Sequence, residues 1–156
     1  MRVHLIAIGQ RMPGWVAEGF EAYRKRLGRE LPFVLRELPA VARSKGQDAA
    51  RAIDEEGDRL LGAVPAGAVV VLLDERGTAW STRNLAEQVA QWRQGGRDVA
   101  LLAGGADGVS ANVRRAAQKV WSLSALTLPH PLVRIVVIEQ LYRAVTLLSG
   151  HPYHRD

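Results

Sequence analysis

Three of the four histidines lie close to the ends of one apolar segment, 132–148, near the C-terminus. His130 precedes this segment, and His151 and His154 follow it. Histidine ordinarily titrates near neutral pH, so these side chains are suited to proton transfer. Three imidazoles could also bind a metal ion, but no carboxylate stands at a usual ligand spacing and the chain contains no cysteine. We therefore expect acid–base chemistry here and no metal site.

Three charged residues, Arg134, Glu139 and Arg143, interrupt the same segment. Glu139 and Arg143 stand four positions apart, which places them on one face of a helix and predicts a structural ion pair. Burying such a pair on an apolar helix is costly, and this favours a functional face as well. The tail that follows contains Tyr153, His154 and Arg155. We expect the tail to lie against this face, where tyrosine and arginine suit stacking on a base and holding a phosphate.

Three predicted strand ends are unusual, and ligands of open α/β sheets bind where strands end. One is Leu73 with Asp74. The second is the pair Gly104 and Gly105, whose missing side chains allow a ligand to approach the backbone. A plain turn is the alternative interpretation of this pair. The third is the loop 123–128, whose backbone groups need partners that a ligand could supply.

The motifs of the common nucleotide-binding loops are absent. Gly9 stands alone after the first predicted strand, so neither the G-x-G-x-x-G turn nor a G-x-x-x-x-G-K-[ST] phosphate loop occurs. The glycine-rich first turn of Rossmann-type methyltransferases is missing for the same reason. A nucleotide-like ligand would therefore bind late in the chain, and a flavodoxin-like flavin or phosphate binder is disfavoured.

The composition describes a single basic domain, 1–156. With 47% hydrophobic residues in 156, the chain can bury a core. The net charge of +5 favours an anionic partner such as nucleic acid, with an ordinary basic cytosolic protein as an equal alternative. The absence of cysteine and of signal-peptide features fits a cytoplasmic protein. The charges at Arg134, Glu139 and Arg143 argue against a membrane span in the last segment.

The hydrophobic periodicity predicts alternating strands and helices. We expect strands at 2–8, 32–38, 68–74, 98–103 and 121–123. The helices are expected to begin at Pro13, at 47, at Ser81 or Thr82, at Ser110 and at Pro131. This alternation predicts an α/β fold with a mainly parallel sheet flanked by helices.

The same patterns assign several side chains to faces. Trp15 is expected to point toward the core. Residues 75–77 are expected to form an exit loop, and Lys119 to lie in the helix capped by Ser110. The acidic residues of the second helix are expected to face solvent: Asp54, Glu55, Glu56 and Asp58.

Basic residues that could contact RNA phosphates occur in two helices. They are Arg24, Lys25, Arg26 and Arg29 in the first helix, for which a solvated face is an equal alternative, and Arg114 and Arg115 in the fourth helix. Arg43 and Lys45 make the loop after the second strand basic.

These motifs closely resemble, in type and order, those of the ribosomal RNA large subunit methyltransferase H family. The most specific are the run Leu-Ser-Ala-Leu-Thr-Leu-Pro-His at 123–130, Arg134 with the run Glu-Gln-Leu-Tyr-Arg at 139–143, and the terminal His-Pro-Tyr-His at 151–154. Weaker likenesses are Leu73 with Asp74, the glycines 104, 105 and 108, and the N-terminal segment 7–13. The resemblance covers the whole chain.

The resemblance implies a SPOUT fold, which is an α/β domain with a C-terminal trefoil knot that works as a homodimer. It also implies S-adenosylmethionine as methyl donor and N3 of a pseudouridine in large-subunit (23S) ribosomal RNA as acceptor. Several positions match the family's cofactor-binding motifs, and Gly105 is added because it adjoins Gly104. The expected cofactor-binding residues are therefore Leu73, Gly104, Gly105, Leu123, Ser124, Ala125, Leu126, Thr127 and Leu128.

The resemblance marks catalytic positions without assigning their chemistry. His154 is our first candidate for the base that accepts the N3 proton, and Glu139 is the second. Arg143 could stabilise negative charge on the ring, and Tyr153 could stack on the base.

Two other functions remain open on the sequence. One is a methyltransferase of the same fold that acts on tRNA. The other is a non-catalytic RNA-binding or ribosome-associated module, which would bind RNA without a cofactor and would leave the loop 123–128 unexplained.

Overall fold

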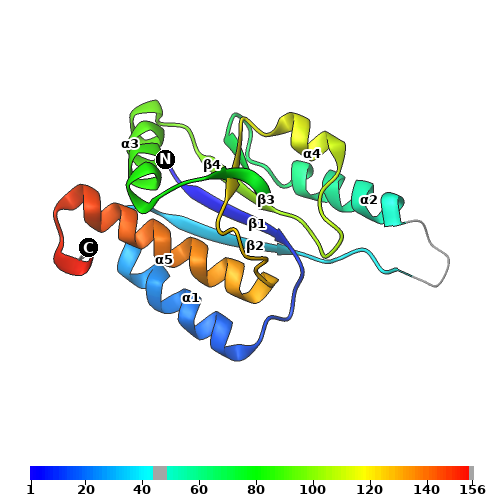
Figure 1. The fold of residues 1–156 in the computed structure, drawn as a ribbon, viewed down its shortest axis with the longest axis horizontal. Coiled ribbons are helices and arrows are strands. Elements are labelled where there is room, and N and C mark those ends of the chain that lie inside the picture. The colour runs from blue at the N-terminus through cyan, green and yellow to red at the C-terminus, as the bar shows by residue number, and fades with distance from the viewer. Residues whose placement is uncertain (44–48, 155–156) are drawn as a thin grey trace.

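The computed structural model describes residues 1–43 and 49–154, in which one parallel sheet lies between two layers of helices (Figure 1). The sheet has the strand order β2-β1-β4-β3-β5, and every neighbouring pair is parallel. The strands are β1 (Val3–Ile8), β2 (Phe33–Leu38), β3 (Val69–Ala79), β4 (Val99–Ala103) and β5 (Lys119–Ser122). The helices are α1 (Gly14–Leu27), α2 (Ala49–Gly62), α3 (Thr82–Gly95), α4 (Ala111–Ala116), α5 (His130–Ser149) and the 3-10 helix η1 (Pro152–His154). The predicted α/β fold is confirmed. Lys45 and Arg155 lie outside the described residues.

The apolar central strands explain this layering. β4 is buried at every position and β1 at all but one, as expected when helices cover both faces of a sheet. One face packs on α1, α3 and α5 through Phe20, Leu85 and Val137. The other face packs on α2 and α4 through Leu60 and Val113.

Strand β3 is longer than its sequence predicts. Residues 75–77 were expected to form an exit loop, but the strand continues to Ala79 and pairs with β5 across a β-bulge. Gly77 lies over the main chain of Val120, where a Cβ would come within 2.6 Å of the carbonyl oxygen. The prediction is wrong because a bulge allows a polar, glycine-containing segment to keep its strand pairing.

Helix α4 is shorter than predicted. It ends at Ala116, and Lys119 belongs to β5 instead. The Gln118 side chain accepts a hydrogen bond from the Val70 N–H at 2.6 Å, and the Gln118 N–H donates to the Val70 carbonyl at 2.9 Å. This pairing with β3 starts β5 earlier than the predicted residue 121.

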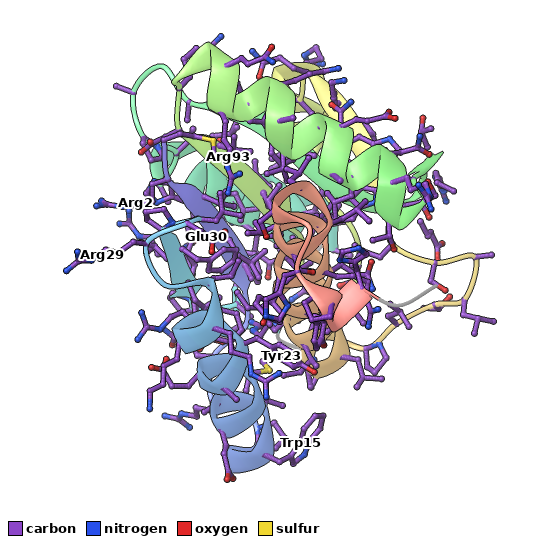
Figure 2. All side chains as sticks on the ribbon, turned by 90° about the vertical axis from the view of Figure 1, so that its left-hand side faces the viewer. Arg2, Trp15, Tyr23, Arg29, Glu30 and Arg93 are labelled. Carbon is purple, nitrogen blue, oxygen red and sulfur yellow. The ribbon has the colours of Figure 1, made fainter. Side chains whose placement is uncertain are left out.

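Two predictions about which helical side chains face the core and which face solvent are also wrong. Trp15 is 54% exposed and projects from the end of α1 away from the sheet, while Val16 is buried in its place (Figure 2). Glu56 was expected to face solvent but is only 2% exposed, because it has polar partners that are far away in the sequence.

Helix α5 is buried between α1 and α3 over much of its length. It begins at His130, one residue before the predicted start at Pro131, and ends at Ser149, after which Gly150 caps it in the left-handed conformation. None of the helices in the described part of the chain combines the length and the hydropathy that a bilayer span needs.

The side chain of Arg134 joins three elements in the interior. It is 1% exposed, and its guanidinium donates to the Glu37 carboxylate at 3.0 Å, to the Gly9 carbonyl at 2.9 Å and to the His130 carbonyl at 2.9 Å. The ends of β1 and β2 are thereby tied to the first turn of α5.

Replacing Arg134 with methionine should lower the free energy of unfolding by about 3 kcal/mol, because the Glu37 carboxylate and the carbonyls of Gly9 and His130 lose the donor that the buried guanidinium supplies. Urea denaturation measures this change. The matched control is Arg93→Met, since Arg93 is exposed and donates a hydrogen bond to the Glu30 carbonyl (Figure 2). The control should change stability by no more than about 0.5 kcal/mol. Equal losses in both variants would contradict a special role for Arg134.

Candidate functional site

A cavity of about 550 Å³ opens beside the bulge of β3, where the sequence predicted that strand to end, and at the carboxyl ends of β4 and β5. Its size is typical of a small-molecule site. We call it the strand-end cavity. Every predicted cofactor-binding residue except Ala125 lines it, and the lining also includes Asp74, Glu75, Arg76, Asp107, Arg114 and His130. The three unusual strand ends of the sequence therefore meet at one place.

Short-range hydrogen bonds shape the loop 123–128. The Ser122 hydroxyl donates to the Ser124 carbonyl at 3.1 Å, and the Ser124 hydroxyl accepts from the Leu126 N–H at 2.9 Å. The Thr127 hydroxyl donates to the Glu75 carboxylate at 3.2 Å, which joins the loop to the extended part of β3. Leu126 is 74% exposed, so the loop presents an apolar side chain at the mouth of the cavity.

The turn after β4, residues 104–108, is here called the glycine loop. Gly105 and Gly108 form an antiparallel bridge, and the Gly108 N–H donates to the Gly105 carbonyl at 3.2 Å. A Cβ on Gly104 would collide with Val109 and lie 2.8 Å from the Gly108 carbonyl oxygen. The fold of the loop itself therefore requires glycine at 104, whether or not a ligand also approaches.

Charges of both signs line the rim of the cavity. Asp74 pairs with Arg114 at 2.5 Å and accepts the Arg76 N–H at 2.8 Å. Sequence reasoning placed Asp74 at a strand end but assigned Arg114 to RNA contact only. The two are 40 positions apart, so their pairing becomes visible only when α4 is placed beside β3.

His130 also lines the cavity, and sequence reasoning did not assign it there. Burial and then the nearby charge of Arg134 lower the pKa of His130 below its ordinary value, while Glu56 acts weakly in the opposite direction. The imidazole is therefore neutral at physiological pH.

Side chains at the other end of α5 form what we call the terminal cluster: Glu139, Arg143, Tyr153 and His154. The predicted ion pair is present, with Arg143 donating to the Glu139 carboxylate at 2.7 and 3.0 Å. The Tyr153 hydroxyl donates to the same carboxylate at 3.1 Å and lies 3.5 Å from the Tyr23 hydroxyl of α1. The Arg143 guanidinium lies 5.0 Å from the centre of the Tyr153 ring. The tail is thus held against the predicted face.

The environment determines what each member of the terminal cluster can do. Burial and the hydrogen bond with Tyr23 raise the pKa of Tyr153, so its phenol stays protonated and acts as a donor. Hydrogen bonding to Glu139 raises the pKa of Arg143, which keeps its charge. Nδ1 of His154 is buried and has no hydrogen-bond partner among the described residues.

The strand-end cavity and the terminal cluster do not meet within one chain. Val133 lines the cavity, and Arg143 follows ten residues later on the same helix. At a rise of 1.5 Å per residue this is about 15 Å. Figure 1 shows the tail at the far end of α5 from the loop that enters the helix. No group of acidic, histidine or cysteine residues in the described ranges has the geometry of a metal site.

Comparison with known proteins places these features in a family. The sequence model described as "Predicted SPOUT methyltransferase" matches residues 1–154. A protein named ribosomal RNA large subunit methyltransferase H from Methylococcus capsulatus is 52% identical over 155 residues, which cover 99% of this chain and 100% of that protein. Its namesake from Thioalkalivibrio sulfidiphilus is 51% identical over 156 residues, which cover 100% of both.

A solved structure supports the fold. A probable methylase family protein from Haemophilus influenzae matches with a TM-score of 0.58 and 13% identity, covering 99% of this chain and 70% of that one. The resemblance drawn from the sequence motifs is confirmed. The chain belongs to the SPOUT methyltransferase family, together with the proteins named ribosomal RNA large subunit methyltransferase H.

Proposed function

We propose that this chain transfers a methyl group from S-adenosylmethionine to N3 of a pseudouridine in large-subunit ribosomal RNA, in the cytoplasm. The observation that carries the proposal is the strand-end cavity, which is formed by the segments that resemble the family's cofactor motifs. Family membership supports methyl transfer, and the names of the two relatives support ribosomal RNA as the acceptor. The net charge of +5 suits a nucleic-acid substrate.

The residues of the cavity fit this donor. S-adenosylmethionine supplies an activated methyl group on a sulfonium when it is bound. The main chain of 123–128 offers N–H and C=O groups for an adenine edge, and Leu123 and Leu128 offer apolar surface for its faces. Asp74 and Glu75 provide negative charge for the cationic part of the donor.

The terminal cluster fits the acceptor side of the reaction. N3 of the base must lose its proton, and His154 is the group to which we assign its acceptance. Glu139 orients Arg143 and Tyr153, since it accepts hydrogen bonds from both. Arg143 stabilises negative charge on the ring, and Tyr153 stacks on the base.

A second copy of the chain brings the terminal cluster to the cavity. The separation of about 15 Å along α5 prevents one chain from joining the two. Trp15 and Leu132 are 54% and 40% exposed at the starts of α1 and α5, and large exposed apolar side chains on neighbouring helices favour burial in an interface. We therefore propose a homodimer in which the tail of one copy completes the other's site, with the family's knot positioning the loop before α5.

With labelled S-adenosylmethionine, the protein should methylate large ribosomal subunits that lack the modification, and it should not methylate tRNA.

Gly104→Ala should lower both donor affinity and methylation by ten-fold or more, because its Cβ displaces the glycine loop (roughly 1.4 kcal/mol per factor of ten). Calorimetry measures the donor affinity.

Gly62→Ala is the matched control, since a Cβ there meets nothing within 4 Å. Equal donor binding by both variants would place the donor elsewhere. Methylation of tRNA in preference to the large subunit would support the alternative substrate.

His154→Ala should lower turnover by about a hundred-fold while leaving donor affinity unchanged, because its role is in proton transfer.

Co-expression of His154→Ala with Gly104→Ala tests the dimer. Half of random dimers are mixed, and each mixed dimer has one intact composite site, so about a quarter of wild-type activity should return. No recovery would show that each chain uses its own tail.

Donor affinity should stay constant from about pH 8 to about pH 7 and weaken as the pH falls through the lowered pKa of His130. Protonation there places a positive charge beside a cationic ligand. His130→Asn should remove the dependence. Calorimetric titrations from about pH 8 to about pH 5 check the effect, and a decline that begins above pH 7, or no decline at the acidic end, would contradict it.

A further inference from the structure

Glu56 is a buried carboxylate that the proposed chemistry does not use. It is 2% exposed, lies on α2 and is not part of the cavity lining. Its carboxylate accepts the Val41 N–H at 3.0 Å and the Arg43 guanidinium at 3.2 Å. A buried carboxylate keeps its charge only with such partners, so the segment 41–43 is part of its environment.

The same carboxylate lies directly behind the glycine loop. A Cβ on Gly105 would come within 2.5 Å of a Glu56 oxygen, so the loop packs on the carboxylate as closely as a glycine allows. Arg43 extends the contact, because it also pairs with Asp107 at 2.5 Å. Gly105 and Asp107 both line the strand-end cavity.

The next residue of α2 touches the other end of the loop. A Cβ on Gly57 would collide with the side chain of Ser110, which caps α4 by accepting the Val113 N–H at 3.3 Å. Two adjacent positions of α2 therefore contact both ends of the segment 104–110. This observation is independent of the charges at Glu56.

We propose that Arg43, Glu56 and Gly57, here called the loop support, hold the glycine loop in its ligand-binding shape, with Glu56 as a positioning residue. Through Arg43 the segment 41–43 is coupled to the cavity, so a displacement of that segment displaces Asp107 and Gly105. The identity of the ligand as S-adenosylmethionine rests on the proposed function. The role of the loop support in holding the glycine loop does not depend on which ligand binds.

Variants of the loop support should weaken ligand binding without a matching loss of fold. Arg43→Gln, Asp107→Asn and Glu56→Gln should each lower the affinity for S-adenosylhomocysteine by about ten-fold at a temperature where the protein is folded. The double variant of Arg43 and Asp107 should lose little more than Arg43→Gln alone, because that single change already breaks the contacts of Arg43 with both Glu56 and Asp107. Calorimetry measures affinity, and amide hydrogen exchange measures opening of 104–110, which should increase.

Asp58→Asn is the matched control, because Asp58 is an exposed carboxylate of the same helix. It should change neither affinity nor exchange. If Glu56→Gln does not fold, the Arg43 and Asp107 variants decide, since these side chains are 30% and 43% exposed.

Three outcomes would overturn the loop support: unchanged affinity and exchange in the variants, independent effects in the double variant, or increased exchange spread evenly over the sheet. A wild type that does not bind S-adenosylhomocysteine would overturn the donor assignment instead, and the exchange of 104–110 would still decide the role of Glu56.

Discussion

The buried guanidinium of Arg134 is the interaction on which the placement of both sites depends. Removing a guanidinium from water is tolerated only when its donors are well paired, and here Glu37, Gly9 and His130 supply the acceptors. These acceptors belong to three different elements. The start of α5 is therefore fixed beside the ends of β1 and β2, and the loop 123–128 must cross from β5 at the sheet edge to reach it.

The two helical layers support different parts of the site. On one face of the sheet, α2 carries Glu56 and Gly57 to the back of the glycine loop. On the other face, α1 and α5 hold the terminal cluster through Tyr23 and Glu139. Because α5 is one continuous helix of 20 residues, its length sets the distance between the cavity and the terminal cluster.

Structural features that depend on a local pattern of residues could be predicted from the sequence. Continuous apolar runs mark buried strands, and a parallel topology places their carboxyl ends at one edge, so the cavity could be predicted from three strand ends. The burial of Glu56 could not, because Arg43 and Gly105 are its neighbours only in space. The continuation of β3 through Gly77 depends on a bulge against β5, which no local periodicity reveals. The inward face of α1 was misassigned by one position at Trp15, since Val16 satisfies the same period.

The contact between Gly9 and Arg134 also bears on how the protein is made. It joins groups 125 positions apart in the chain. Strands β1 and β2 can pair early during synthesis, but the carbonyl of Gly9 has no guanidinium to accept from until Arg134 has been translated. Contacts between distant parts of a chain also form slowly. The nascent chain therefore has to remain soluble with an incomplete sheet, and α5 completes the surroundings of the first strand only after the strands of the sheet have been translated.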